Sequence, residues 1–129
     1  MHKPLLKIGT LLAALTIILG AFAAHTLKAK LQADALAIFE TAVRYQMYHC
    51  IAICIAAILY KEIPYNNIAI AGKLFLVGII FFSGSLYLLT FLKAINNTNF
   101  NWVGAITPLG GVAFIFGWLL LFWGVHRGK

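Results

Sequence analysis

Four long apolar stretches, separated by short polar segments, dominate the pattern of hydrophobic and polar positions along this chain of 129 residues. Each stretch approaches the roughly 20 residues that a helix needs to cross the hydrocarbon of a bilayer. The second reaches that length only together with the amphipathic segment in front of it. The pattern predicts an all-α integral membrane bundle of four transmembrane helices, in one domain over residues 1–129, with helices at about 4–25, 34–61, 71–93 and 103–125.

The composition agrees with a membrane protein. Hydrophobic residues make up 63% of the chain and charged residues 10%, which leaves too few polar side chains to cover a water-soluble domain. The net charge of +7 comes from Lys and Arg residues dispersed beside the apolar stretches. This dispersal favours contacts with membrane lipids, anionic ones included, over the clustered phosphate contacts of a nucleic-acid-binding protein. No nucleic-acid partner is expected.

The same basic residues predict the orientation. With both termini in the cytoplasm, six Lys and Arg residues lie inside and four outside, a modest bias that favours this topology. Trp118 and Trp123 would then mark the inner interface, as amphipathic rings do at head-group level. The inner set is Lys3, Lys7, Lys61, Lys73, Arg127 and Lys129, and the outer set is Lys28, Lys30, Arg44 and Lys93.

The first apolar stretch has a second interpretation. Lys3 and Lys7 precede an apolar core, and the Ala-Phe-Ala segment before Ala24 resembles the cleavage site of a secretory signal peptide. We expect a transmembrane helix that is present in the mature chain.

Polar side chains concentrate where the predicted helices cross one half of the membrane. The segment 41–50 places Arg44, Gln46 and His49 in a membrane helix, where each is costly unless other polar groups satisfy it. We expect these groups to converge in the outer half, with Arg44 paired to Glu40 and its charge held inside the bundle. The predicted polar cluster comprises His25, Glu40, Arg44, Tyr45, Gln46, Tyr48, His49, Ser83, Ser85, Tyr87 and Thr107.

The polar cluster has two interpretations. Its hydroxyls and amides could join the helices to one another, as polar side chains commonly do in membranes, or they could bind a solute, an ion or a lipid. A haem site would need His25 and His49 at similar depth on neighbouring helices. The sequence contains no HExxH or GxSxG motif. We expect no catalytic residue, no metal and no cofactor, with Cys50 and Cys54 packed as small hydrophobic side chains.

Small residues in the first and fourth helices predict close packing. The fourth helix carries a glycine every seven residues, a spacing that lets another backbone approach. This pattern also suits a homo-oligomer or a membrane-protein partner. Pro108 is expected to leave the carbonyl of Gly104 without its helical donor. The predicted packing residues are Gly20, Ala24, Pro108, Gly110, Gly117 and Gly124.

Four segments resemble the signature blocks of the small YgdD/YwdK family of bacterial inner-membrane proteins, which has mitochondrial relatives in animals. They are GAFAAHTLK from Gly20, FETAVRYQMYH from Phe39, FSGSLYLL from Phe82 and ITPLGGVAFIFGW from Ile106. The blocks occur in order over nearly the whole chain. The resemblance implies a four-helix protein of the bacterial inner (plasma) membrane with no established activity, and it carries no catalytic residue to this chain.

The sequence favours one function and leaves others open. The glycine pattern, the basic segments and the lack of a catalytic motif favour a non-enzymatic membrane component that binds lipid or protein. The polar cluster favours, as the alternative, a carrier or pore for a small solute or proton. Compact four-helix carriers hold a carboxylate deep in their first helix, whereas this first helix contains no acidic residue. The third class is an oxidoreductase with bound haem or quinone.

Overall fold

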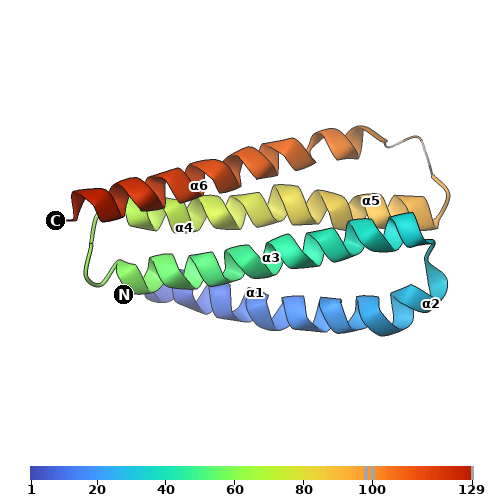
Figure 1. The fold of residues 1–129 in the computed structure, drawn as a ribbon, viewed down its shortest axis with the longest axis horizontal. Coiled ribbons are helices and arrows are strands. Elements are labelled where there is room, and N and C mark those ends of the chain that lie inside the picture. The colour runs from blue at the N-terminus through green and yellow to red at the C-terminus, as the bar shows by residue number, and fades with distance from the viewer. Residues whose placement is uncertain (98, 100, 129) are drawn as a thin grey trace.

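The computed structural model describes residues 1–128 except Thr98 and Phe100, and its helices are shown in Figure 1. The first long helix runs through α1 (Lys3–Phe22), η1 (Ala23–Leu27) and α2 (Lys28–Lys30), and the second is α3 (Ala33–Leu59). The third joins α4 (Asn66–Gly78), η2 (Ile79–Ser83) and α5 (Gly84–Ala94). The fourth joins η3 (Asn101–Ala105) and α6 (Thr107–Arg127). All four are long and apolar enough to cross a membrane, which confirms the predicted all-α class.

Two helix ends differ from the predicted bounds. The first helix continues to Lys30 instead of ending near residue 25, and the third begins at Asn66 instead of near residue 71. In the added turn of α4, Ile68 is fully buried and lies where a side chain at Gly124 of α6 would be. Packing against α6 therefore extends this helix beyond the purely apolar stretch.

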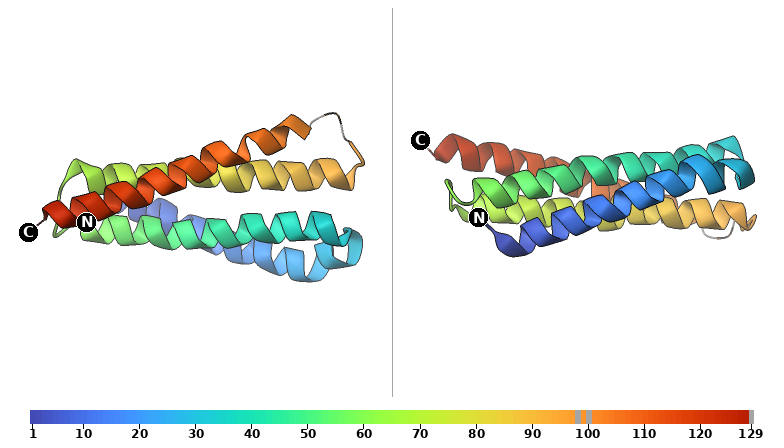
Figure 2. Two further views of the ribbon diagram at one scale, coloured as in Figure 1. Left: turned by 45° about the horizontal axis from the view of Figure 1, so that its top comes forward. Right: turned by 90° about the horizontal axis from the view of Figure 1, so that it is seen from below.

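The helices follow the order α1, α3, α4 with α5, and α6 across the bundle. α1 packs on α3, α3 packs on α4 and α5, and α6 packs on α4 and η2. α1 and α6 therefore lie on opposite flanks (Figure 1), and Figure 2 shows both inclined to the helices between them. Both termini and the α3–α4 connection lie at one end, the terminal end, and the α2–α3 and α5–η3 connections lie at the other, the far end.

The core lies between α3 and the third helix and is covered from both flanks. Ile53 and Phe75 are fully buried in it, and Leu5 of α1 and Leu121 of α6 pack against the same cluster. The flanks are apolar on the outside as well: Leu11, for example, is 73% exposed. Faces of this kind are costly in water but meet acyl chains in a bilayer.

The glycines of α6 bring its backbone close to the third helix. A Cβ atom at Gly117 would lie 2.6 Å from Cε1 of Phe75, and one at Gly110 would collide with the backbone of Phe82. Gly124 faces Ile68 in the same way. The predicted glycine stripe therefore packs against the third helix of its own chain, so it gives no support to a contact with a second copy.

The predicted small-residue pair of the first helix is only half correct. Gly20 lies near Val43: a Cβ atom at this glycine would be 3.5 Å from Cγ1 of the valine, an ordinary contact distance. Ala24 is exposed, while Ala23 is buried. The buried stripe of this helix repeats every seven residues through Gly9, Thr16 and Ala23, so Ala24 lies one position outside it.

Pro108 begins α6 and does not interrupt a helix. It lies in the first turn of α6, where its missing N–H would have no helical partner in any case. Gly104 belongs to the preceding 3₁₀ turn, η3. The absence of a helical donor to the carbonyl of Gly104 stays a prediction, because Gly104 lies outside α6.

Candidate functional site

Part of the predicted polar cluster joins α3 to the third helix. The hydroxyl of Tyr87 donates to Oε1 of Gln46 at 2.7 Å, and Oγ of Ser83 donates to the carbonyl oxygen of Ala42 at 2.8 Å. Gln46 and Ser83 are buried. These groups satisfy one another where neither water nor lipid could do so.

A second polar contact joins α5 to α6. Oγ of Ser85 lies 2.6 Å from Oγ1 of Thr107 and donates to the carbonyl oxygen of Phe82 at 2.9 Å. Because the one hydroxyl proton of Ser85 is used on Phe82, Thr107 is the donor between the two side chains. The structure thus forms separate polar contacts at two helix interfaces instead of one convergent group.

Three residues of the predicted polar cluster are not inside the bundle. His25, Glu40 and Arg44 are all exposed, and among the described residues no ion pair joins Glu40 to Arg44. The buried face of α3 passes through Phe39, Ala42 and Gln46, which turns the positions of Glu40 and Arg44 outward. The expectation of a buried Arg44 charge is therefore wrong.

His49 is buried and is held at both ring nitrogens. Nδ1 lies 2.7 Å from the carbonyl oxygen of Tyr45, and Nε2 accepts from Nε1 of Trp118 at 3.3 Å. Its ring stacks on Phe114 with the centroids 3.4 Å apart and the planes at 8°. A backbone carbonyl needs Nδ1–H and the indole needs a free Nε2, so this arrangement selects the neutral imidazole.

The hydrogen bonds of His49 bear on two further predictions: the interfacial position of Trp118 and the pairing of His25 with His49. Trp118 does not mark the inner interface, because it bonds His49 and lies nine residues before Arg127, roughly 14 Å along the helix. Trp123 remains near the end of α6, with the guanidinium of Arg127 5.5 Å above its ring. The structure does not bring His25 and His49 together as a ligand pair, because His25 is exposed and both nitrogens of His49 are engaged.

An apolar groove of about 520 Å³ opens beside His49, between α3 and α6, and is called the aromatic groove here. Phe82 of η2 lies between the two helices, with ring centroids 4.7 Å from Tyr45 and 5.5 Å from Phe114. Gly111 leaves space on the α6 side, since a Cβ there would have Phe82 as its nearest neighbour at 3.9 Å. The lining residues are Tyr45, Tyr48, His49, Phe82, Gly111, Phe114, Ile115 and Trp118.

The aromatic groove lies near the middle of the membrane-spanning length of α3. His49 precedes Tyr60, at the terminal end of α3, by 11 residues, which is roughly 16 Å of helix, and half the hydrocarbon thickness is about 15 Å. Phe82 belongs to the π-helical segment η2, and π-helical turns inside α-helices occur frequently at functional sites. The groove therefore combines a position deep in the membrane with an irregular helix segment.

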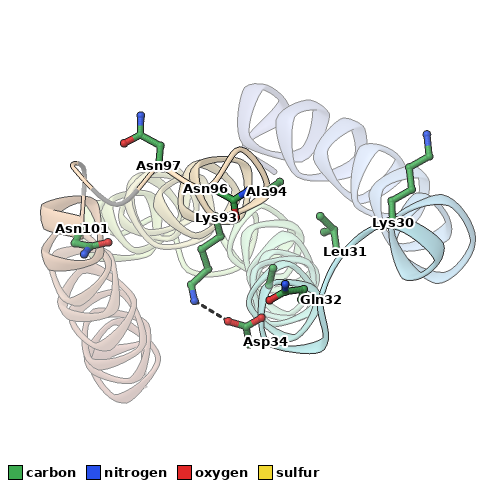
Figure 3. A pocket seen from close by; sticks show the side chains of 10 residues that line it. Lys30, Leu31, Gln32, Asp34, Lys93, Ala94, Asn96, Asn97 and Asn101 are labelled. Atoms are coloured by element: carbon green, nitrogen blue, oxygen red, sulfur yellow. Dashed lines mark hydrogen bonds and ion pairs between the residues drawn. The ribbon is translucent and has the colours of Figure 1, made fainter.

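A polar depression, also of about 520 Å³, lies at the far end, between the α2–α3 and α5–η3 connections. Nζ of Lys93 donates to Oδ2 of Asp34 at 2.8 Å across it. Figure 3 shows these two side chains pointing toward each other, whereas Lys30 points away from them. The ion pair ties the two connections together and neutralises one of the two lysines that line the depression.

The sequence pattern alone did not predict the α6 side of the aromatic groove. Phe114 and Trp118 are four residues apart, and Gly111 precedes Phe114 by three, a spacing that places them on one helix face. That spacing could have indicated an aromatic surface facing His49. Phe82 carried no such signal, because its direction depends on the π-helical turn of η2.

Cysteine and metal chemistry add no further site. Cys50 is buried and Cys54 half-buried, and both are free thiols. Oγ1 of Thr16 lies 3.8 Å from Sγ of Cys50, so this thiol packs between α1 and α3. Within the part of the chain that the structure describes, no three His, Cys, Asp or Glu side chains are grouped so that they could hold a metal ion.

Comparison with known proteins gives consistent matches at the level of sequence. Residues 19–111 match the family described as "Protein of unknown function (DUF423)". The UPF0382 membrane protein YwdK of Bacillus subtilis is 39% identical over 120 residues, which cover 92% of this chain and 93% of that protein. A UPF0382 membrane protein of Staphylococcus saprophyticus is 41% identical over 97% of this chain and 98% of its own length.

A relative outside these two genera extends the match. A UPF0382 membrane protein of Haemophilus influenzae is 40% identical over 88% of this chain and 86% of its own length. No solved structure matches the chain. The relatives are named as membrane proteins and four helices here have membrane-spanning length, which confirms the predicted multi-pass bacterial membrane protein. The chain belongs to the DUF423 family of UPF0382 membrane proteins, a family of unknown function.

Proposed function

We propose that this chain is a non-enzymatic membrane component that binds a lipid in the aromatic groove. The observation that carries the proposal is the groove itself: a space of about 520 Å³, within the ~300–1,000 Å³ usual for small-ligand sites, opening from the bundle at hydrocarbon depth. An apolar molecule in the bilayer can enter such a groove from the side, without passing through water.

The walls of the groove suit an apolar occupant. Phe82 contacts both Tyr45 and Phe114, so the three rings form a continuous aromatic surface. Both ring nitrogens of His49, which also lines the groove, are hydrogen-bonded. Gly111 keeps the α6 wall open. A ligand that contacts these rings gains dispersion interactions that mobile acyl chains make only transiently.

The polar contacts support lipid binding over the carrier alternative. Gln46 and Tyr87 bond each other, as do Ser85 and Thr107, so these side chains offer little to a passing solute. The three acidic residues of the chain, Asp34, Glu40 and Glu62, are all exposed. A proton carrier needs a titratable group along its path inside the membrane, and His49, which lies at that depth, has both ring nitrogens hydrogen-bonded.

The basic residues give a second expectation, contacts with anionic lipid head groups. Lysines and arginines lie near both ends of the helices, and the net charge is +7. These charges support contacts with anionic head groups, each worth about 1 kcal/mol near a charged surface. Such contacts surround the protein, whereas the aromatic groove would hold one molecule.

The test is retention of lipid by a variant whose groove is filled. Gly111→Leu places a side chain in open space and should leave the melting temperature in detergent nearly unchanged. The control is Gly104→Leu, which adds the same side chain where no atom lies within 4 Å and outside the groove. Native mass spectrometry of the purified proteins should show one retained lipid per chain, lost only in Gly111→Leu. Equal retention by both variants would disprove the proposal.

A further inference from the structure

We infer that the occupant of the aromatic groove is a quinone-type lipid, a flat ring with carbonyl groups on an apolar tail. The inference rests on the proposed function and names the ligand class of the same groove. It concerns binding only.

Two phenol hydroxyls at the groove favour a ligand that accepts hydrogen bonds. Tyr45 and Tyr48 are 39% and 53% exposed, and their rings contact each other at 5.8 Å between centroids. Neither hydroxyl has a hydrogen-bond partner among the described residues, in contrast to Tyr87, which bonds Gln46. A hydroxyl in hydrocarbon without a partner is costly, so a ligand that supplies an acceptor would be favoured.

The position of these tyrosines along α3 favours an uncharged ligand. Tyr48 precedes Tyr60 by 12 residues, roughly 18 Å of helix, which places its backbone near the middle of a hydrocarbon layer of ~30 Å. Charged phospholipid head groups stay at the surface of that layer. An uncharged ring lipid carries its polar atoms into the layer, where Tyr48 can donate to them.

The shape and chemistry of the groove walls favour a flat ring with acceptor groups. The groove presents aromatic rings, which stack well on a flat ring. Its unsatisfied groups are hydroxyls that can donate, and quinone carbonyls only accept. Nε2 of His49 already accepts a hydrogen bond from Nε1 of Trp118, so this nitrogen is not available as a partner for the ligand. Hydrogen-bond donors in an aromatic groove match acceptors on a flat, neutral ligand.

The experiment uses quenching of tryptophan fluorescence by a decyl-tailed benzoquinone in detergent micelles. A full-length chain with Trp102→Phe and Trp123→Phe reports from Trp118 at the groove. The reference is the same Trp118-only chain with Gly111→Leu, which fills the groove. Quenching of Trp118 should saturate at one quinone per chain, whereas the filled chain should show only a gradual, non-saturating loss. Identical non-saturating curves for both would overturn the inference.

Hydroxyl deletion tests the proposed hydrogen bonds. Tyr48→Phe combined with Tyr45→Phe should weaken quinone binding at least tenfold, since the loss of even one hydrogen bond of ~1.4 kcal/mol has that effect. Tyr65→Phe, an exposed tyrosine outside the groove, is the matched control and should bind as before. Thermal unfolding of each variant verifies that the fold is kept.

Competition separates the ligand class from the proposed function. Decylbenzene has the same tail but no carbonyl group, and it should displace the quinone only at much higher concentration. If decylbenzene competes equally and the tyrosine variants bind normally, the quinone assignment is wrong while the lipid groove stands. If Gly111→Leu changes neither quinone quenching nor lipid retention, the groove is not a binding site and both proposals fail.

Discussion

The hydroxyl of Tyr87 donates a 2.7 Å hydrogen bond to Oε1 of Gln46, which joins α5 to the middle of α3. The ring of Phe39 packs on Tyr87 at 5.0 Å between centroids, so the phenol is held from both its apolar and its polar side. This contact explains how a buried glutamine is tolerated in a membrane helix: its carbonyl is satisfied by a neighbour that is itself fixed by packing.

Tyr87→Phe should lower the free energy of unfolding by about 0.5–2 kcal/mol. The substitution keeps the ring against Phe39 but leaves buried Oε1 of Gln46 without its donor. Unfolding in mixed micelles with increasing denaturing detergent measures the change. Tyr65→Phe removes a hydroxyl from an exposed ring and is the control; equal stability of the two variants would show that the Tyr87 bond contributes nothing.

Two neighbouring glycines of α6 should respond oppositely to the same substitution. Gly110→Ala drives a methyl group into the backbone of Phe82, and overpacking of this kind costs about 1–3 kcal/mol. Gly111→Ala meets only a 3.9 Å contact and gains helix propensity of up to ~1 kcal/mol. Melting temperatures in one detergent decide the matter. A loss at Gly111 with none at Gly110 would mean that α6 is rotated relative to this structure.

Arg44→Ala should change the free energy of unfolding by less than about 0.5 kcal/mol. Arg44 is exposed, and the described residues offer it no ion pair, so the substitution removes a side chain that extends toward head groups. Thermal unfolding in a neutral detergent is the measurement. A loss of several kcal/mol would instead support a charge held inside the bundle.

Sequence patterns predicted how far along a helix a residue lies better than which side of the helix it occupies. Apolar length was enough for four helices, and the seven-residue glycine spacing was enough for the face of α6 that packs on Phe75 and Phe82. Gln46 and Arg44 lie two residues apart on α3, so they point to nearly opposite sides, and apolar residues on both sides gave no sign of which faced inward. The aromatic groove was not predictable as a whole, because Phe82 reaches it through a π-helical turn.

Orientation in the membrane is predicted by charge. The start of α1 and the end of α6 lie at the same end of the bundle (Figure 1), and by sequence position alone six basic residues are assigned to that side against four to the other. We predict that a reporter fused after the last residue gives a cytoplasmic signal, and that one inserted beside Asn96 in the far-end connection gives an external signal. An external signal from the C-terminal fusion would reverse the topology.

The size of the bias makes this topology sensitive to small changes. Lys3→Gln together with Lys61→Gln lowers the number of basic residues at the terminal end from six to four, the same number as at the far end. The chain should then insert in both orientations. Each reporter should give a mixture of cytoplasmic and external signals. Lys28→Gln together with Lys30→Gln is the matched control, because it removes two charges from the far end and leaves six against two. That control should keep one orientation. If the first pair of substitutions leaves the orientation unchanged, the basic residues do not set it, and the packing of α1 on α3 before insertion is complete becomes the better explanation.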